Sequence, residues 1–287
     1  MDIAFVDGYG AAVTQLTDPH LPRSRARTDA RQAVGRTAAH RVLVLDFDGT
    51  VCLGDAPVWA YAEAVIHEIG SGAAHLADPA PAIRGALAAF LHGIERAPRY
   101  LDGYAAVAAI TDGLATDRQR ATAYRASRQA LATGGLDTHA PAGLDELLAE
   151  LAGTVHRVVV TNAPAAGVRD TLATIGLGDV IDEVITDAGK PAGWRDLLPR
   201  LLDGRAPADL LAVGDVWAND IEPLLDAGCC TALVDRFRQN AGPAHLISDT
   251  LPDMYDAIRL WAAHPDAFVA AHPPRPIDDP ASIIETR

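Results

Sequence analysis

Seven polar side chains of this sequence could act together as a metal and phosphate site. Each lies at the end of one of four apolar runs or shortly after it, and in chain order they are Asp46, Asp48, Thr161, Asn162, Lys190, Asp215 and Asp220. Carboxylates crowded into one place repel each other and raise one another's pKa values, and a hard divalent cation relieves that repulsion. Mg²⁺ prefers oxygen ligands and is usually held by one or two carboxylates together with substrate phosphate. If the fold gathers these side chains, they predict a Mg²⁺ site that binds a phosphate group.

The elements that would position them are five short apolar runs, each typical of a buried strand. These runs cover residues 42–45, 156–162, 180–186, 209–215 and 230–235. The third contains Asp182 and Glu183, so it is a marginal strand and is expected at the sheet edge. Segments with helical spacing lie between or after them, at 164–176, 191–203, 219–228 and 251–264. This alternation predicts an α/β fold with a doubly wound parallel sheet and helices on both faces. Ligands of such sheets bind at the carboxyl ends of the strands, where the seven side chains are expected to meet.

Each motif alone has a simpler explanation. Asp-x-Asp-Gly, at Asp46 to Gly49, is a common turn sequence. Thr161-Asn162 before Ala-Pro is an ordinary helix N-cap. Turn chemistry does not explain why all the motifs follow successive strands, so the joint placement favours a site.

Lys190 is the only lysine of the chain, and every other fixed positive charge is an arginine. One lysine could have remained by chance. A compact ammonium, however, can contact both the Asp46 carboxylate and a phosphoryl group in a crowded site, whereas the wider guanidinium prefers a planar, bidentate partner. The single lysine therefore predicts a contact that arginine could not make.

The order of these motifs resembles the haloacid dehalogenase (HAD) superfamily of hydrolases. DFDGT comes first, Thr161-Asn162 follows a strand, Lys190-Pro191 comes next, and GDVWAND is last. The match covers about residues 41–56 and 145–264. It implies a Rossmann-like core and phosphatase-type chemistry, with a helical type-1 cap inserted between the first two motifs.

The resemblance also implies a role for each residue. Asp46 is expected to be the nucleophile that forms an aspartyl-phosphate, and Asp48 the general acid and base. The phosphate is expected to contact Thr161, Asn162 through its backbone N–H at a helix N-terminus, and Lys190. Expected Mg²⁺ ligands are the Asp46 carboxylate, the Asp48 backbone carbonyl and Asp215, with Asp220 binding metal-bound water or orienting Lys190. Members that cleave carbon–halogen bonds lack a carboxylate at the position of Asp48, so dehalogenase chemistry is not expected.

Residues 57–144 contain several segments with helical spacing and no convincing strand, and they predict the helical cap. Hinges are expected near 52–58 and 138–143, which contain Gly and Pro. Candidates for substrate contact in the cap are Trp59, Tyr61, Arg84, His92, Arg96, Arg99, Tyr100 and Tyr104. Residues 1–40 are expected to be a disordered extension, and 265–287 a Pro-rich tail.

Composition excludes some classes of function. The formal net charge of −14 disfavours binding to nucleic acid. No apolar stretch reaches the roughly 20 residues that a membrane span needs. The three cysteines, of which Cys229 and Cys230 are adjacent, show no disulfide framework. These features predict a cytoplasmic protein, and they say nothing about its oligomeric state.

The resulting hypothesis is a Mg²⁺-dependent phosphatase of a small phosphorylated metabolite. One alternative is a phosphotransferase or phosphomutase that uses the same aspartyl-phosphate. A further alternative is a protein that binds a phosphometabolite without turning it over. The sequence does not separate hydrolysis from transfer and does not identify the substrate.

Overall fold

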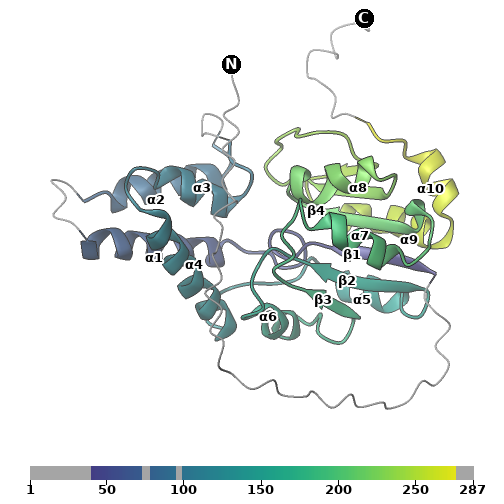
Figure 1. Ribbon diagram of the computed structural model, residues 1–287, viewed down its shortest axis with the longest axis horizontal. Coiled ribbons are helices and arrows are strands. Elements are labelled where there is room, and N and C mark those ends of the chain that lie inside the picture. Colours follow the sequence, from purple (N-terminus) through teal and green to yellow (C-terminus); the bar gives the residue numbers. More distant parts are fainter. Residues whose placement is uncertain (1–39, 73–77, 95–98, 276–287) are drawn as a thin grey trace, which may run out of the picture. The chain divides into compact units, whose positions relative to one another are not determined.

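The computed structural model describes residues 40–72, 78–94 and 99–275. Within them, a six-stranded parallel sheet has the order β3-β2-β1-β4-β5-β6 (Figure 1). Its strands are β1 (Arg41–Leu45), β2 (Val155–Val160), β3 (Glu183–Ile185), β4 (Leu210–Gly214), β5 (Cys230–Val234) and β6 (Leu246–Ser248). The predicted extension of residues 1–40 lies outside the described residues except for His40. So do residues 276–287 of the predicted tail.

The strand register brings the ends of three strands to the same edge. Leu45, the last residue of β1, is aligned with Val159 of β2 and with Val213 of β4. The residues that follow these three strands therefore begin at the same edge of the sheet, within about one residue of each other along the strand direction. This register, which follows from continuous apolar strands packed side by side, is what can gather residues distant in sequence.

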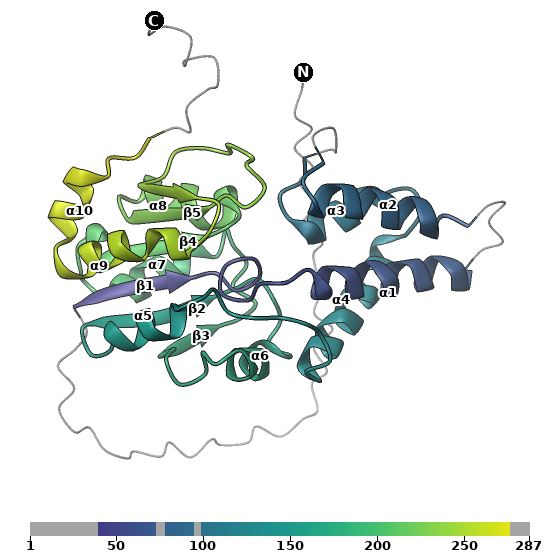
Figure 2. The ribbon, with the colours of Figure 1, turned by 180° about the vertical axis from the view of Figure 1, so that it is seen from behind.

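Helices cover both faces of the sheet, as the alternating side chains of β1 require. Leu43 and Leu45 belong to the apolar cluster that contains α5 (Leu144–Glu150), α6 (Val168–Thr174) and α9 (Tyr255–Ala263). Val42 and Val44 belong to the opposite cluster, with α7 (Trp194–Leu202) and α8 (Glu222–Asp226). Figure 2 shows α5 and α9 in front of β1, and Figure 1 shows α7 on the other face. The predicted doubly wound fold is confirmed.

A helical cap is inserted between β1 and β2, as predicted. It consists of α1 (Ala56–Gly72), α2 (Ala80–Leu91), α3 (Gly103–Ile110) and α4 (Asp117–Ala132). These helices share their own apolar cluster, which includes Val65, Leu87 and Val107 and is distinct from the two clusters at the sheet. Helix α4 begins with a capping box, in which Thr116 and Gln119 each bond the other's backbone N–H.

The two connections of the cap pair with each other. The Leu53 N–H donates to the His139 carbonyl at 2.8 Å, and the His139 N–H donates to the Leu53 carbonyl at 3.0 Å. Gly54 has a φ of +113°, and a Cβ there would collide with the carbonyl of Asp137. Glycine is thus required where the chain leaves the core. Both predicted hinge segments, 52–58 and 138–143, take part in this pairing.

Some elements differ from the predicted ones. The predicted helix 164–176 begins only at Val168, and 219–228 begins with a turn of π-helix at Trp217–Ile221. The third predicted strand is shortened to Glu183–Ile185. Its position at the sheet edge agrees with the expectation from its acidic residues. Strand β6 was not predicted. Within the predicted Pro-rich tail, Pro265–Ala271 form α10, whose Phe268 packs into the core and is fully buried.

Among the described residues, no helix has both the length and the apolar character that crossing a membrane requires.

Candidate active site

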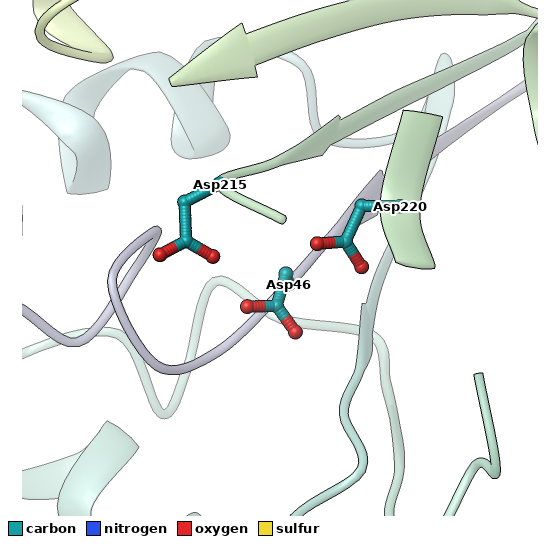
Figure 3. Close-up of side chains that lie close together, drawn as sticks. All are labelled: Asp46, Asp215 and Asp220. Carbon is teal, nitrogen blue, oxygen red and sulfur yellow. The ribbon is translucent and has the colours of Figure 1, made fainter. Parts of the chain in front are cut away.

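Three carboxylates meet at the carboxyl edge of the sheet. Asp46 directly follows β1, Asp215 directly follows β4, and Asp220 lies in the π-helical turn after Asp215. One oxygen of each carboxylate lies within 4.8 Å of an oxygen of the other two. In Figure 3 the three side chains lie close together, with Asp46 between Asp215 and Asp220. The register of β1 and β4 is therefore sufficient to bring two of the predicted metal ligands together.

Lys190 joins two of these carboxylates. Its Nζ donates to Asp46 Oδ1 at 2.6 Å, to Asp220 Oδ1 at 2.5 Å and to the Val160 carbonyl at 2.9 Å. The side chain is buried, so these three acceptors replace the water that its ammonium would otherwise bind. The predicted contact of the single lysine with the Asp46 carboxylate is thus present, and its contact with a phosphoryl group stays a prediction.

Asn162 holds the backbone of Lys190 in place. Its Oδ1 accepts from the Lys190 N–H at 2.6 Å, and its Nδ2 donates to the Lys190 carbonyl at 3.0 Å. Thr161 is buried, and its hydroxyl accepts from the Ala163 N–H at 3.0 Å. The expectation that Asn162 stands at a helix N-terminus is wrong, because a turn separates it from α6, which begins at Val168. Phosphate contact by Thr161 and Asn162 stays a prediction.

The glycine of the first motif makes room for Asp215. Gly49 has a φ of +80°, and a Cβ there would collide with the Asp215 carboxylate. A residue with a side chain would be strained at this φ and would also displace that carboxylate. The Asp-Gly pair therefore serves the site as well as the turn.

Burial and mutual repulsion raise the pKa values of the clustered carboxyl groups, which favours a bound cation. Burial raises the pKa of Asp46 from 3.8 to about 7; Lys190 lowers this pKa and Asp220 raises it. Burial, together with Asp46 and Asp220, raises the pKa of Asp215 well above its ordinary value. The Asp215 Oδ1 atom is buried and has no hydrogen-bond partner among the described residues. The Lys190 ammonium thus contacts Asp46 and Asp220 but not Asp215. A group of carboxylates with one member left without a partner fits the oxygen ligands that a hard divalent cation prefers.

This arrangement predicts a pH-dependent stability. Between pH 4 and 7 the folded protein keeps a proton on Asp46 that the unfolded chain has released. The free energy of unfolding of the metal-free protein should therefore fall as pH rises through that window. Asp102, whose pKa burial raises to about 6, acts in the same direction.

Mg²⁺ should reverse this loss. A ligand at a hundred times its dissociation constant stabilises by about 2.7 kcal/mol, which is on the order of 5–10 °C in Tm for a domain of this size. We expect that gain at pH 8 and little at pH 5, measured by thermal unfolding with Mg²⁺ or with EDTA. Asp215→Asn should weaken the pH dependence and remove the Mg²⁺ effect. An EDTA-treated protein that becomes more stable from pH 5 to 8 would contradict the interpretation.

Asp48 faces an arginine of the cap. Both of its carboxylate oxygens accept from Arg128 Nη1 of α4, at 3.0 and 3.1 Å. The same Nη1 lies 3.1 Å from the Tyr104 hydroxyl of α3. The Arg128 side chain is only 1% exposed. A cap residue therefore orients the side chain that was predicted to be the general acid.

Arg128 was missing from the candidates in the cap. The sequence pattern of α4 could have indicated it. Ala123, Ser127 and Leu131 form the buried face of this helix, and Arg128 is buried beside them. An arginine on the buried side of an amphipathic helix needs a partner. Of the named candidates, Tyr104 is the one that contacts Arg128, and Tyr61 packs on the Tyr104 ring.

The other candidates have different surroundings. Arg84 pairs with Glu63 on the cap surface, and His92 caps α2. Arg99 Nη1 donates to the backbone carbonyl of Gln239, which lies in the loop after β5. The side-chain amide of Gln239 donates to the backbone carbonyl of Tyr100. Trp59 packs against the apolar cluster of the cap. Arg96 lies outside the described residues.

Several solved structures of HAD hydrolases are similar to this chain in fold. A magnesium-bound HAD-hydrolase from Bacillus subtilis aligns with a TM-score of 0.52 at 17% identity, covering 76% of this chain and 98% of that one. A HAD phosphatase from Thermococcus onnurineus gives 0.49 at 18% identity, with 76% and 97% covered. The L-2-haloacid dehalogenase from Xanthobacter autotrophicus gives 0.47 at 20% identity, with 76% and 98% covered.

No protein-family model matches the sequence, and no curated protein is significantly similar to it. The structural likeness thus defines a HAD-type α/β fold with an inserted helical cap, in agreement with the motif order. At these identities it defines the fold and leaves the reaction to be argued from the site.

Proposed function

We propose that this protein is a Mg²⁺-dependent phosphatase of small phosphomonoesters. The observation that carries the proposal is the buried Asp46–Lys190–Asp220 contact beside the unpaired Asp215. The carboxylate proposed as the nucleophile, an ammonium and a third carboxyl group without a hydrogen-bond partner for its Oδ1 thus lie together at the carboxyl edge of the sheet, where ligands of parallel α/β sheets bind. Dianionic phosphate is the substrate group that such an arrangement suits once a cation is bound.

The residues that would hold Mg²⁺ are Asp46, Asp215 and the backbone carbonyl of Asp48. The cation, when bound, neutralises negative charge on phosphoryl oxygens and on the carboxylates around it. Asp220 accepts from Lys190, and its second oxygen accepts from the Val216 N–H at 3.1 Å. Its position favours the orientation of Lys190, the second of the two roles expected for it.

The proposed reaction has two displacement steps at phosphorus. In the first, an Asp46 carboxylate oxygen attacks phosphorus, the bond to the ester oxygen breaks, and Asp48 gives that oxygen its proton. In the second, Asp48 takes a proton from water, the water oxygen attacks phosphorus, and the bond to Asp46 breaks. Lys190 keeps the attacking carboxylate oriented and stabilises charge on the phosphoryl oxygens.

The cap is part of this mechanism because it supplies Arg128. The guanidinium holds both oxygens of Asp48 and so fixes the carboxylate at the boundary between cap and core. A small substrate enclosed beneath the cap suits this arrangement, since water can be excluded until the ester is in place. A phosphorylated metabolite is therefore a better candidate than a folded phosphoprotein.

The test is phosphate release from a panel of sugar, polyol, nucleotide and aromatic phosphomonoesters, with Mg²⁺ and with excess EDTA. We expect release that requires Mg²⁺. Parallel samples with an added alcohol detect phosphoryl transfer, and samples with 2-haloacids detect halide release. Transfer that exceeds hydrolysis would favour a phosphotransferase, and halide release without phosphate release would overturn the proposal. Tight binding of esters without turnover would favour a binding protein.

A further inference from the structure

The Arg128 guanidinium has donors that its known contacts do not use. All of its described hydrogen bonds, to Asp48 and to Tyr104, involve Nη1. Nε and Nη2 are buried and have no hydrogen-bond partner among the described residues. Buried donors of a charged group are costly to leave unpaired. The arrangement therefore needs an explanation beyond the ion pair with Asp48.

The two unpaired nitrogens lie on one edge of the guanidinium. Nε and Nη2 together form the planar fork that donates two parallel hydrogen bonds to a carboxylate or a phosphate. If the role of Arg128 were only to bind Asp48, a bidentate contact through such an edge would satisfy more donors than the observed contact through Nη1 alone. Among the described residues, this fork has no acceptor.

The surroundings of Arg128 are aromatic and close to the reaction centre. The guanidinium carbon lies 5.7 Å from the centre of the Phe47 ring, and Phe47 stands between Asp46 and Asp48 in the chain. Tyr104 supplies a hydroxyl to the same guanidinium and packs edge-on against Tyr124. Asp48 must reach the leaving oxygen of the ester, so a group held by Arg128 lies only a few bonds from that oxygen.

We propose that Arg128 is a specificity-determining residue that binds a second anionic group of the substrate through Nε and Nη2. The substrate class is then a small phosphomonoester with a carboxylate, or a second phosphoryl group, near the ester oxygen. This inference rests on the proposed phosphatase function of the same site. It specifies that the leaving group carries an anionic substituent. Neither the fold nor the Asp46–Lys190–Asp220 contact defines that property.

The first test compares matched esters. The ratio of kcat/KM for 2-phosphoglycolate to that for ethyl phosphate measures the preference for a carboxylate, and ethylene glycol bisphosphate measures the preference for a second phosphate. For one of the two anionic esters we expect the wild-type ratio to be about 10²-fold, the factor expected for a charge-assisted bidentate contact. Arg128→Lys, which keeps the charge and loses the fork, should lower the ratio at least tenfold, and Arg128→Gln should bring it near one.

The matched control is Arg125→Lys. Arg125 lies one turn earlier on α4, is exposed, and donates to Thr122. Its substitution should leave the ratio at the wild-type value. A wild-type ratio near one for both anionic esters would overturn the proposal. So would an Arg128→Lys variant in which kcat/KM falls equally for charged and neutral esters, since that result indicates a role through Asp48 alone.

A binding measurement separates this proposal from the proposed reaction. With Mg²⁺ present, calorimetry compares 3-phosphonopropionate and 1,3-propanebisphosphonate with propylphosphonate, none of which can be hydrolysed as an ester. We expect one of the two anionic ligands to bind the wild-type protein at least tenfold more tightly, and the difference to disappear in Arg128→Gln. That result without turnover of any ester would keep the role of Arg128 and reject the phosphatase. Turnover of esters with equal binding of all three phosphonates would reject the role of Arg128 and keep the phosphatase. Equal binding of all three phosphonates to the wild-type protein would overturn the proposal even if the Arg128 variants do not fold.

Discussion

Asp46→Asn should abolish phosphate release, with a loss of about 10⁴-fold or more, and leave the protein folded. An amide nitrogen or oxygen is a far poorer nucleophile than a carboxylate, and removing the attacking group affects both displacement steps. The substitution keeps the size of the side chain and removes one negative charge from a buried cluster. Because burial raises the pKa of Asp46 to about 7, the neutral amide should not destabilise the metal-free protein at neutral pH.

The measurement is initial-rate phosphate release with the best ester of the panel, together with thermal unfolding of the same samples. Acid-quenched wild-type enzyme should carry covalently bound phosphate during turnover, and Asp46→Asn should carry none. Asp226→Asn, at the exposed end of α8, makes the same chemical change away from the site and should retain full activity. Turnover within tenfold of wild type in Asp46→Asn would show that another group attacks phosphorus.

Lys190→Arg should lower kcat by at least about 10²-fold, the loss typical of one transition-state contact. The lysine Nζ has three acceptors within 2.9 Å, and these acceptors come from three different segments of the core. A guanidinium is wider than an ammonium and presents a flat fork, so it cannot donate to all three. Burial alone would lower the pKa of Lys190, but Asp220 and Asp46 raise it, so the side chain is charged at every pH of interest.

The extra atoms should also destabilise the fold by about 1–3 kcal/mol, as overpacking of buried sites generally does. Rate measurements at saturating ester, with thermal unfolding alongside, separate the two effects. Arg200→Lys tests the reverse exchange at an exposed ion pair, where Arg200 contacts Glu183 at 3.1 Å. It should change neither rate nor Tm appreciably. A Lys190→Arg enzyme with wild-type turnover would contradict our explanation of why this one lysine remains.

The parts of the fold that the sequence predicted well depend on local patterns. Continuous apolar runs such as 42–45 and 209–214 must be buried on both faces, and the helical segments between them allow a parallel sheet with few alternatives. Once the strands are parallel, residues that follow them share an edge. The meeting of Asp46, Asp215, Asp220 and Lys190 follows from that rule without knowledge of any distance. Their catalytic roles stay predictions.

The parts that the sequence did not predict depend on distant packing. Strand β6 has only three residues and forms because β5 offers a free edge beside it. Helix α10 is stabilised by Phe268, whose burial and ring contacts with His245 and His272 depend on the folded core. The partner of Arg128 lies on another segment, so the pattern of α4 could indicate that a partner was needed but not which residue it is.

The central position of β1 has a consequence for the synthesis of this protein. β1 is synthesised before the other strands of the described sheet, yet it lies between β2 and β4, which follow only after the entire cap has been made. Until then the nascent chain carries the apolar run Val42–Leu45 with neither edge paired, the kind of segment that associates with other chains. The cap helices, with a local apolar cluster of their own, can fold in the meantime. Chains that terminate before Val155 would keep β1 exposed permanently, so premature termination should yield fragments that aggregate or occupy chaperones.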